Sequence, residues 1–334
     1  MSSVCEGIFY YTLKKERLFR MKNIFKVVLF ALVLTVLAAC GNTETNKNVA
    51  SEEEQQTQNE TQVFPITVTD AVGTDVTIEK APNRIVSLIP SNTEILFELG
   101  MGDQVVGVND NDNYPKEVES IEKIGGMEYN IEMIISLQPD LVVAHESGLY
   151  GLGDGIAQLE AAGISVFVVK NAVTFEETYE TILQIGQLTG TTQQAKKVNE
   201  HIQTKLQEIT DKVKQVEPKT AFVVVGVEPD IYAVGSGTFL DEMLKVANIK
   251  NAVTEADWPM YSAEQFVASN ADYVIATYAS DLDALKGNEL FKTMKAVQAN
   301  QLVTVDGDLT SRQAPRLAEG VEQLAKVVYP ELFE

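Results

Sequence analysis

The sequence predicts an α/β protein built from two lobes of similar plan. The main observation is a pattern that occurs twice, once in N-I-E-M-I-I-S-L-Q-P-D-L-V-V-A-H (130–145) and once in S-A-E-Q-F-V-A-S-N-A-D-Y-V-I-A-T (262–277). Each copy starts as a short helix and ends in a continuous apolar run, which is typical of a strand buried on both faces of a parallel sheet. A helix followed by a buried strand, found near each end of the folded part, therefore indicates two α/β lobes.

The polar residues of this pattern also correspond between the copies. Asn130 and Ser262 stand at the expected N-caps, where a side-chain oxygen accepts a hydrogen bond from a free backbone amide. Glu132 and Glu264 follow two residues later, and a carboxylate there suits the positive end of the helix dipole. An aspartate precedes each apolar run, at positions 140 and 272.

A long amphipathic helix is predicted between the two copies. Apolar residues recur at spacings of three and four at positions 198, 202, 206, 209 and 213. About 22 residues at about 1.5 Å each make a rod of roughly 33 Å. Such a rod joins two lobes as a stiff spine or lies on the surface of one lobe, and the pattern alone leaves both readings open.

Composition excludes several classes of function. The chain has 334 residues and a formal net charge of −22, so its surface repels nucleic acid, which we do not expect as a partner. Its two cysteines, Cys5 and Cys40, both precede the folded part, which rules out a disulfide framework or a thiolate zinc site there.

The N-terminal region has the features of an export signal. Met21 opens a short basic stretch followed by an apolar run, so residues 1–39 are interpreted as a signal peptide with an upstream extension, and translation from Met1 or from Met21 stays open. The segment L-A-A-C-G resembles a lipobox, with Cys40 as the lipid-modified first residue of the mature protein. A transmembrane anchor is the alternative, disfavoured by the small residues before Cys40. The polar segment 40–63 then indicates a flexible tether on the extracytoplasmic face of the membrane.

The remaining chain divides into three predicted parts. Residues 64–172 form the first lobe, residues 173–216 the connecting helices, and residues 217–334 the second lobe. Within the first lobe, Ser91 and Glu94 have the spacing of a capping box that would open a helix after a buried strand.

Four residues are candidates for ligand contact. His145 ends the apolar run of the first copy, and ligands of open α/β sheets bind outside the carboxyl ends of strands. Trp258 is the only tryptophan and is placed to stack on a planar ligand or to pack in the core. Asp308 and Arg312 follow a predicted strand, where they bind ligand amides or pair with each other.

No pattern typical of catalysis or of a resident metal appears. The sequence has no Walker loop, no nucleophile elbow and no dinucleotide-binding glycine motif. Two histidines without a nearby cysteine argue against a zinc cage of the usual kind. We therefore expect a non-enzymatic protein without a cofactor.

Together these segments resemble a known family. The lipobox, the segment R-I-V-S-L-I-P-S-N-T-E (84–94), Gly125-Gly126, the first copy of the pattern and Trp258-Pro259 resemble the iron-complex and vitamin B12 class of ABC-importer substrate-binding proteins. The resemblance covers residues 64–334. It implies two Rossmann-like lobes joined by a single long helix, the class III periplasmic-binding-protein fold, with the ligand held between the lobes.

The resemblance also implies partners and ligand. The protein would capture a corrinoid (vitamin B12) or an iron complex and deliver it to an ABC permease dimer with its ATPase. Glu132 and Glu264 would dock onto permease arginines, and the likeness to the vitamin B12-binding members implies ligand contacts from Trp258, Asp308 and Arg312. Gly126, His145 and Asn111 depart from that pattern, because aromatic residues are expected at these positions.

Three alternatives stay open at this point. One is a ferric siderophore receptor and another a haem receptor, in which His145 would be the axial ligand. The third is an enzyme that uses Glu132 and Glu264 as a carboxylate pair, although glycosidase carboxylates lie about 5–10 Å apart in one site and these belong to different lobes.

The lipobox generates a first prediction. Replacing Cys40 with alanine removes the sulfur that would carry diacylglycerol, so we expect the protein to leave the membrane fraction on cell fractionation. Cys5→Ala is the control, because Cys5 lies upstream of the expected cleavage site. A Cys40→Ala protein that stays on the membrane at the wild-type level would show that Cys40 is not the anchor.

Overall fold

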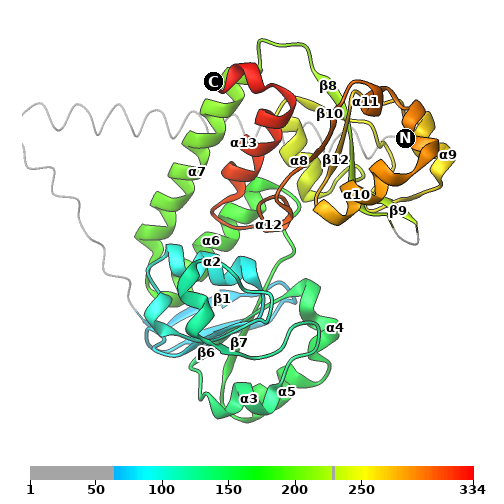
Figure 1. The fold of residues 1–334 in the computed structure, drawn as a ribbon. Coiled ribbons are helices and arrows are strands. Elements are labelled where there is room, and N and C mark those ends of the chain that lie inside the picture. The colour runs from blue at the N-terminus through cyan, green and yellow to red at the C-terminus, as the bar shows by residue number, and fades with distance from the viewer. Residues whose placement is uncertain (1–63, 228–229) are drawn as a thin grey trace, which may run out of the picture. The chain divides into compact units, whose positions relative to one another are not determined.

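The computed structural model describes residues 64–227 and 230–334 (Figure 1). The expected signal peptide, Cys40 and the tether therefore lie outside the described residues. Within the part that is described, no helix is long and apolar enough to cross a membrane.

The first lobe contains a hairpin and a parallel sheet. Strands β1 (Ile66–Thr69) and β2 (Asp75–Ile78) pair antiparallel. The five-stranded sheet has the order β5-β4-β3-β6-β7, and all its neighbours are parallel. Its strands are β3 (Ile85–Ser87), β4 (Val105–Val108), β5 (Glu122–Lys123), β6 (Leu141–His145) and β7 (Ser165–Val169). The chain moves outward from β3 and then returns to β6, so the strand order reverses between β3 and β6, where α/β sheets bind ligands.

Short helices connect these strands. They are α2 (Pro90–Glu98), α3 (Ile131–Ser136), α4 (Leu149–Leu152) and α5 (Gly155–Ala161), with 3-10 turns η1 (Gly102–Gln104), η2 (Lys116–Ser120) and η3 (Glu146–Gly148). The Asn92 side chain of α2 is buried and donates to the carbonyl oxygens of Val143 and Ala144, the closer at 3.0 Å. This bond fixes the start of α2 against the end of β6.

The second lobe has a mixed sheet with the order β11-β9-β8-β12-β13, and β10 also pairs with β8. Strands β8 (Lys219–Gly226), β10 (Ile249–Asn251), β12 (Tyr273–Ala276) and β13 (Leu302–Thr304) run parallel. Strands β9 (Ile231–Ala233) and β11 (Met260–Tyr261) add an antiparallel edge. The helices are α8 (Phe239–Val246), α9 (Ala263–Ala268), α10 (Ala279–Gly287), α11 (Lys295–Gln298), α12 (Gly307–Ser311) and α13 (Leu317–Val328), with turns η4 (Glu289–Thr293) and η5 (Pro330–Leu332).

Two antiparallel helices connect the lobes, α6 (Phe175–Thr189) and α7 (Thr192–Val213). Helix α7 has the predicted length of 22 residues and packs against α6 and against α8 and α13 of the second lobe, and its Gln194 side chain donates to the Glu98 carbonyl oxygen of the first lobe at 3.4 Å. It is therefore shared by both lobes, and the reading as a surface helix of one lobe is wrong. The expected class III fold, two α/β lobes joined by a long helix, is confirmed. The exact lobe boundaries stay predictions.

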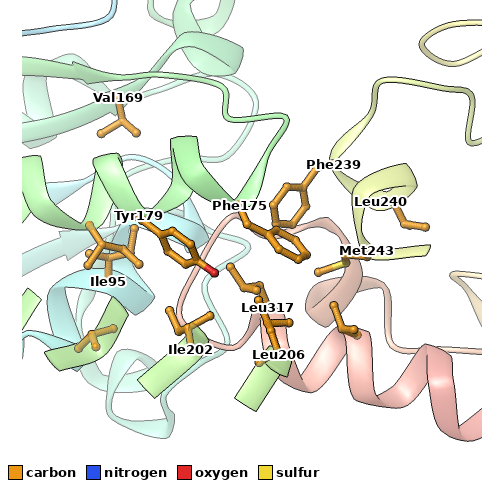
Figure 2. Packing of buried hydrophobic residues seen from close by; sticks show 14 of the residues in the cluster. Ile95, Val169, Phe175, Tyr179, Ile202, Leu206, Phe239, Leu240, Met243 and Leu317 are labelled. Carbon is orange, nitrogen blue, oxygen red and sulfur yellow. The ribbon is translucent and has the colours of Figure 1, made fainter. Parts of the chain in front are cut away.

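One cluster of buried apolar side chains continues through these helices into both lobes (Figure 2). It includes Ile95 and Val169 of the first lobe and Met243 of the second. At its centre the rings of Phe175 and Phe239 lie 5.6 Å apart, edge to face, which is a favourable aromatic geometry. A shared core of this kind resists a hinge motion, because opening it would expose apolar surface to water.

The duplicated pattern has the same structure in both lobes. Asn130 accepts a hydrogen bond from the Met133 amide at 3.0 Å, and Ser262 forms a reciprocal capping box with Gln265. Asp140 accepts from the Arg84 amide at the start of β3, as Asp272 does from the Thr220 amide in β8.

The capping box expected at Ser91 and Glu94 is wrong. Helix α2 begins two residues earlier than that capping box requires, at Pro90, and its N-cap Ile89 makes no side-chain cap. Proline suits this first helical position because its ring presets φ and its missing N–H has no partner to lose. Glu94 therefore lies inside the helix, where it is buried.

Candidate ligand-binding site

A cavity of about 640 Å³ lies at the carboxyl ends of both sheets. We call it the central cavity. From the first lobe its wall includes residues that follow β3, β4 and β7, together with His145 at the end of β6. From the second lobe it includes Tyr278, which follows β12, and Asp308 and Arg312, which follow β13. Residues that are far apart in the sequence but that all follow strand ends thus form one polar wall. This is the place where open α/β sheets bind ligands.

The buried carboxylate of Glu94 joins the lobes at this cavity. Its Oε1 accepts from Arg312 at 2.8 Å and from Arg316 at 2.7 Å, and its Oε2 accepts from Arg316 Nε at 2.9 Å. Arg316 therefore binds both oxygens, the geometry that makes arginine–carboxylate pairs strong. Because a buried charge without a partner is very unfavourable, α2 and the segment 312–316 are held together.

Arg312 has further partners within the protein besides Glu94. Its guanidinium donates to Asn113 Oδ1 at 2.9 Å and pairs with Asp308 Oδ1 at 3.0 Å, and Asn113 in turn donates to Asp308 at 2.7 Å. Arg312 is 9% exposed. Of the two roles predicted for Asp308 and Arg312, pairing with each other is the one observed. A ligand that bound Arg312 through Nη1 or Nη2 would compete with these partners.

His145 is 2% exposed and forms part of the cavity wall. Burial lowers its pKa from 6.5 to about 4, although the neighbouring Glu146 charge acts in the opposite direction. The ring is therefore neutral at physiological pH. Its Nδ1 accepts from the Ser147 backbone N–H at 3.1 Å, which places the proton on Nε2. In this tautomer the outer nitrogen is a hydrogen-bond donor, whereas ligation of haem iron through Nε2 would require its lone pair.

Trp258 does not line the central cavity. It is 53% exposed and lies in the loop before β11. Its neighbours Asp257 and Pro259 accept backbone hydrogen bonds from Gly235 and Ala233, so Trp258 lies alongside β9 rather than beyond a strand end. Its stacking role stays a prediction.

Tyr278 is the aromatic residue of the cavity wall that the sequence analysis did not identify, and polar wall residues such as Asn113 and Asn171 were not identified either. Tyr278 immediately follows Thr277, the counterpart of His145 in the second copy of the duplicated pattern. Applying the strand-end argument to both copies would have identified it, because the carboxyl ends of β6 and β12 are equivalent positions.

Glu132 and Glu264 lie outside this wall. Each is exposed and stands in the first turn of its helix, α3 or α9. Neither takes part in a salt bridge within residues 64–227 and 230–334, and no cluster of potential metal ligands occurs there. They belong to different lobes, so they do not form the two carboxylates of one active site.

Comparison with known proteins identifies the family. The periplasmic binding protein family model matches residues 85–309, which include the long helices and the cavity wall apart from Ser311, Arg312 and Gln313. The chain belongs to this family. Its members are solute-binding components of transport, so the chain is a binding protein and not an enzyme.

Individual relatives agree with this assignment. The chain is 42% identical to YvrC of Bacillus subtilis (strain 168), an uncharacterized ABC transporter substrate-binding lipoprotein, over 93% of this chain and 98% of that protein. It is 28% identical to a cobalamin-binding protein of Halobacterium salinarum (strain ATCC 29341 / DSM 671 / R1), over 80% of this chain and 74% of that protein. A possible iron-binding (periplasmic solute-binding) protein of Staphylococcus epidermidis ATCC 12228 has a similar crystal structure, with a TM-score of 0.69, 37% identity and coverage of 75% of this chain and 100% of that one.

The Glu94 carboxylate generates a prediction about stability. Glu94→Gln keeps the side-chain shape but leaves two arginines facing a neutral amide, and breaking a buried ion pair costs about 3–5 kcal/mol. We expect a loss of this order in the free energy of unfolding, measured by urea denaturation. Glu98→Gln is the control, because Glu98 is exposed on the same helix. An equal loss in the free energy of unfolding for the two variants would contradict the proposed contribution of the Glu94 ion pairs to stability.

Asp112 generates a prediction about pH. Burial raises the pKa of this carboxyl from 3.8 to about 6, although Lys123 and Arg312 act in the opposite direction. The folded state therefore binds this proton more tightly than the unfolded state does. The stabilisation from protonated Asp112 is complete below about pH 4 and is lost as the pH rises through about 6. A pKa difference of this size corresponds to about 3 kcal/mol.

Asp112→Asn removes that dependence. We expect the variant to be more stable than the wild type at pH 7.5 and no more stable than the wild type at pH 4, as measured by thermal unfolding at both pH values. Asp110→Asn is the control, because Asp110 is exposed in the same loop. An unchanged difference between Asp112→Asn and wild type across this range would refute the assigned cause.

Proposed function

We propose that this protein is a lipid-anchored extracytoplasmic receptor that captures a corrinoid or an iron chelate in the central cavity and delivers it to an ABC permease. The observation that carries the proposal is the cavity at the carboxyl ends of both sheets. Its volume of about 640 Å³ lies within the range of about 300–1,000 Å³ usual for small-molecule sites. The lipid anchor rests on the lipobox at Cys40 and on the likeness to a substrate-binding lipoprotein.

The polarity of the cavity favours a corrinoid over a polyanionic siderophore. Among the described residues that form its wall, the only cationic side chain is Arg312, and this residue is already paired with Glu94 and Asp308. A tricatecholate complex carries several negative charges and would need free cations to replace its hydration. Neutral amides in the wall, such as those of Asn171 and Gln313, suit the amide groups around a corrin ring. The cobalamin-binding relative supports the same choice.

Absorbance spectroscopy tests the ligand. Purified protein is soaked separately with cyanocobalamin, haemin and a ferric tricatecholate siderophore and then freed of unbound ligand by gel filtration. We expect the protein to retain the absorbance of cyanocobalamin. Retention of haemin or of the siderophore alone would replace the corrinoid with that ligand and leave the transport role intact, whereas retention of none would refute the proposed ligand classes.

Permease docking is proposed for Glu132 and Glu264. Their helix-end position is worth about 0.3–1 kcal/mol, and Asp, Ser or Gln would serve nearly as well there. Glutamate at both places suits a permease dimer that offers an arginine on each half, since carboxylates bind arginine in a bidentate geometry. Charged pairs at the rim of an interface mainly set orientation and association rate.

The double change Glu132→Ala and Glu264→Ala tests docking. We expect ligand affinity and stability close to wild type, uptake reduced to background in cells with the cognate permease, and partial uptake with either single change. The matched control is Glu200→Ala with Glu208→Ala, which removes the same charge from exposed positions on α7. Normal uptake by the first double variant would refute docking, and loss of ligand affinity would move these residues to the binding site.

A further inference from the structure

Tyr278 presents an aromatic ring to the central cavity. It is 57% exposed although it belongs to the cavity wall. Apart from the His145 imidazole, it is the only aromatic side chain among the described residues that form this wall. An aromatic ring left open in a concave polar site has a large area to bury against a ligand.

Gly307 supports the ring from the neighbouring strand end. A Cβ placed on Gly307 would lie 2.9 Å from the Thr277 carbonyl oxygen and 3.4 and 3.5 Å from two ring carbons of Tyr278. The absence of a side chain at Gly307 therefore allows the segments after β12 and β13 to lie in contact. The ring is positioned by backbone on one side, which lowers the entropy that a ligand would lose in ordering it.

A fixed hydrogen-bond acceptor follows directly in the chain. Asp308 is bound by Asn113 at 2.7 Å and by Arg312 at 3.0 Å, and its side chain is still 41% exposed. A flat ring next to an oriented carboxylate matches a ligand with a planar conjugated face and hydrogen-bond donors at its periphery. Tyr114 is also exposed but does not offer this combination, because the Arg316 guanidinium lies 3.8 Å from the centre of its ring.

We propose that Tyr278 stacks on the face of a planar macrocyclic ligand and that Gly307 is the residue that positions it. The inference rests on the proposed receptor function and narrows it to a ligand with a flat macrocycle, a corrinoid or a porphyrin. It also assigns to Tyr278 the stacking role that the sequence suggested for Trp258.

Dissociation constants of purified variants test the assignment, with cyanocobalamin, haemin and a ferric tricatecholate siderophore as probes. For the macrocycle that the wild type binds, we expect Tyr278→Ala to weaken binding at least tenfold, a loss usual for a desolvated aromatic anchor. Tyr278→Phe keeps the ring and stays within about threefold of wild type. Tyr232→Ala is the control, because Tyr232 is partly exposed in the same lobe and does not line the cavity.

A double-mutant cycle tests the role of Gly307. Gly307→Ala is expected to weaken binding about tenfold when Tyr278 is present and to have little further effect in the Tyr278→Ala background, because the two changes remove the same interaction. Circular dichroism and thermal unfolding establish that each variant is folded. Independent, additive effects of the two changes would contradict positioning of the ring by Gly307.

Each result separates this inference from the receptor function. Wild-type binding of a macrocycle that Tyr278→Ala leaves unchanged overturns the inference, as does a loss seen only with Trp258→Ala, and the receptor function stands in both cases. Binding of the siderophore alone also overturns it while leaving a chelate receptor. Binding of none of the probes refutes the proposed function together with the inference.

Discussion

The carboxylate of Glu94 is the interaction on which the site depends. It lies on α2 of the first lobe and binds Arg312 and Arg316, which both precede α13 in the second lobe. Apolar contacts of α6 and α7 also join the lobes, but they are non-directional and determine the cavity wall less strictly. The ion pairs require particular atoms at particular distances. Through Arg312 they also hold Asn113 and Asp308, so one buried charge orients wall residues from both lobes.

The same interaction determines the electrostatic character of the cavity. Arg312 would make the wall cationic if it were free, but it is paired with Glu94 and Asp308. The other basic candidate, His145, is uncharged at physiological pH because burial lowers its pKa to about 4. The wall is left with amides, hydroxyls and a partly exposed carboxylate. Such a surface recognises a ligand by hydrogen bonds and ring contacts more than by net charge, which is the physical reason to place a corrinoid ahead of a polyanion.

The sequence predicted local features well and distant pairings poorly. The caps at Asn130 and Ser262 depend on residues three positions away, so they are visible in a short window. Glu94 has the spacing of a capping box with Ser91, but its partner Arg312 lies 218 residues further along the chain. No local pattern separates these two roles. Trp258 was chosen as a candidate because of its residue type. The residues that line the cavity are instead those that follow the carboxyl ends of strands. Tyr278 meets this criterion, because it follows β12 as His145 ends β6.

The duplicated pattern also separates residues that serve the fold from residues that do not. Asn130 and Ser262 bind helix amides, and the aspartates Asp140 and Asp272 each accept from a backbone amide of the adjacent strand. These hydrogen bonds explain why the four residues recur in both lobes.

The glutamates at positions 132 and 264 also recur, but they make no hydrogen bond or ion pair within the described part of the chain. Their one favourable intramolecular interaction there is with the helix dipole. The recurrence of these glutamates without an intramolecular partner is the reason to propose that they bind a partner outside the chain. Because the two glutamates occupy equivalent positions in two similar lobes, a partner with two similar halves fits them better than a small ligand does.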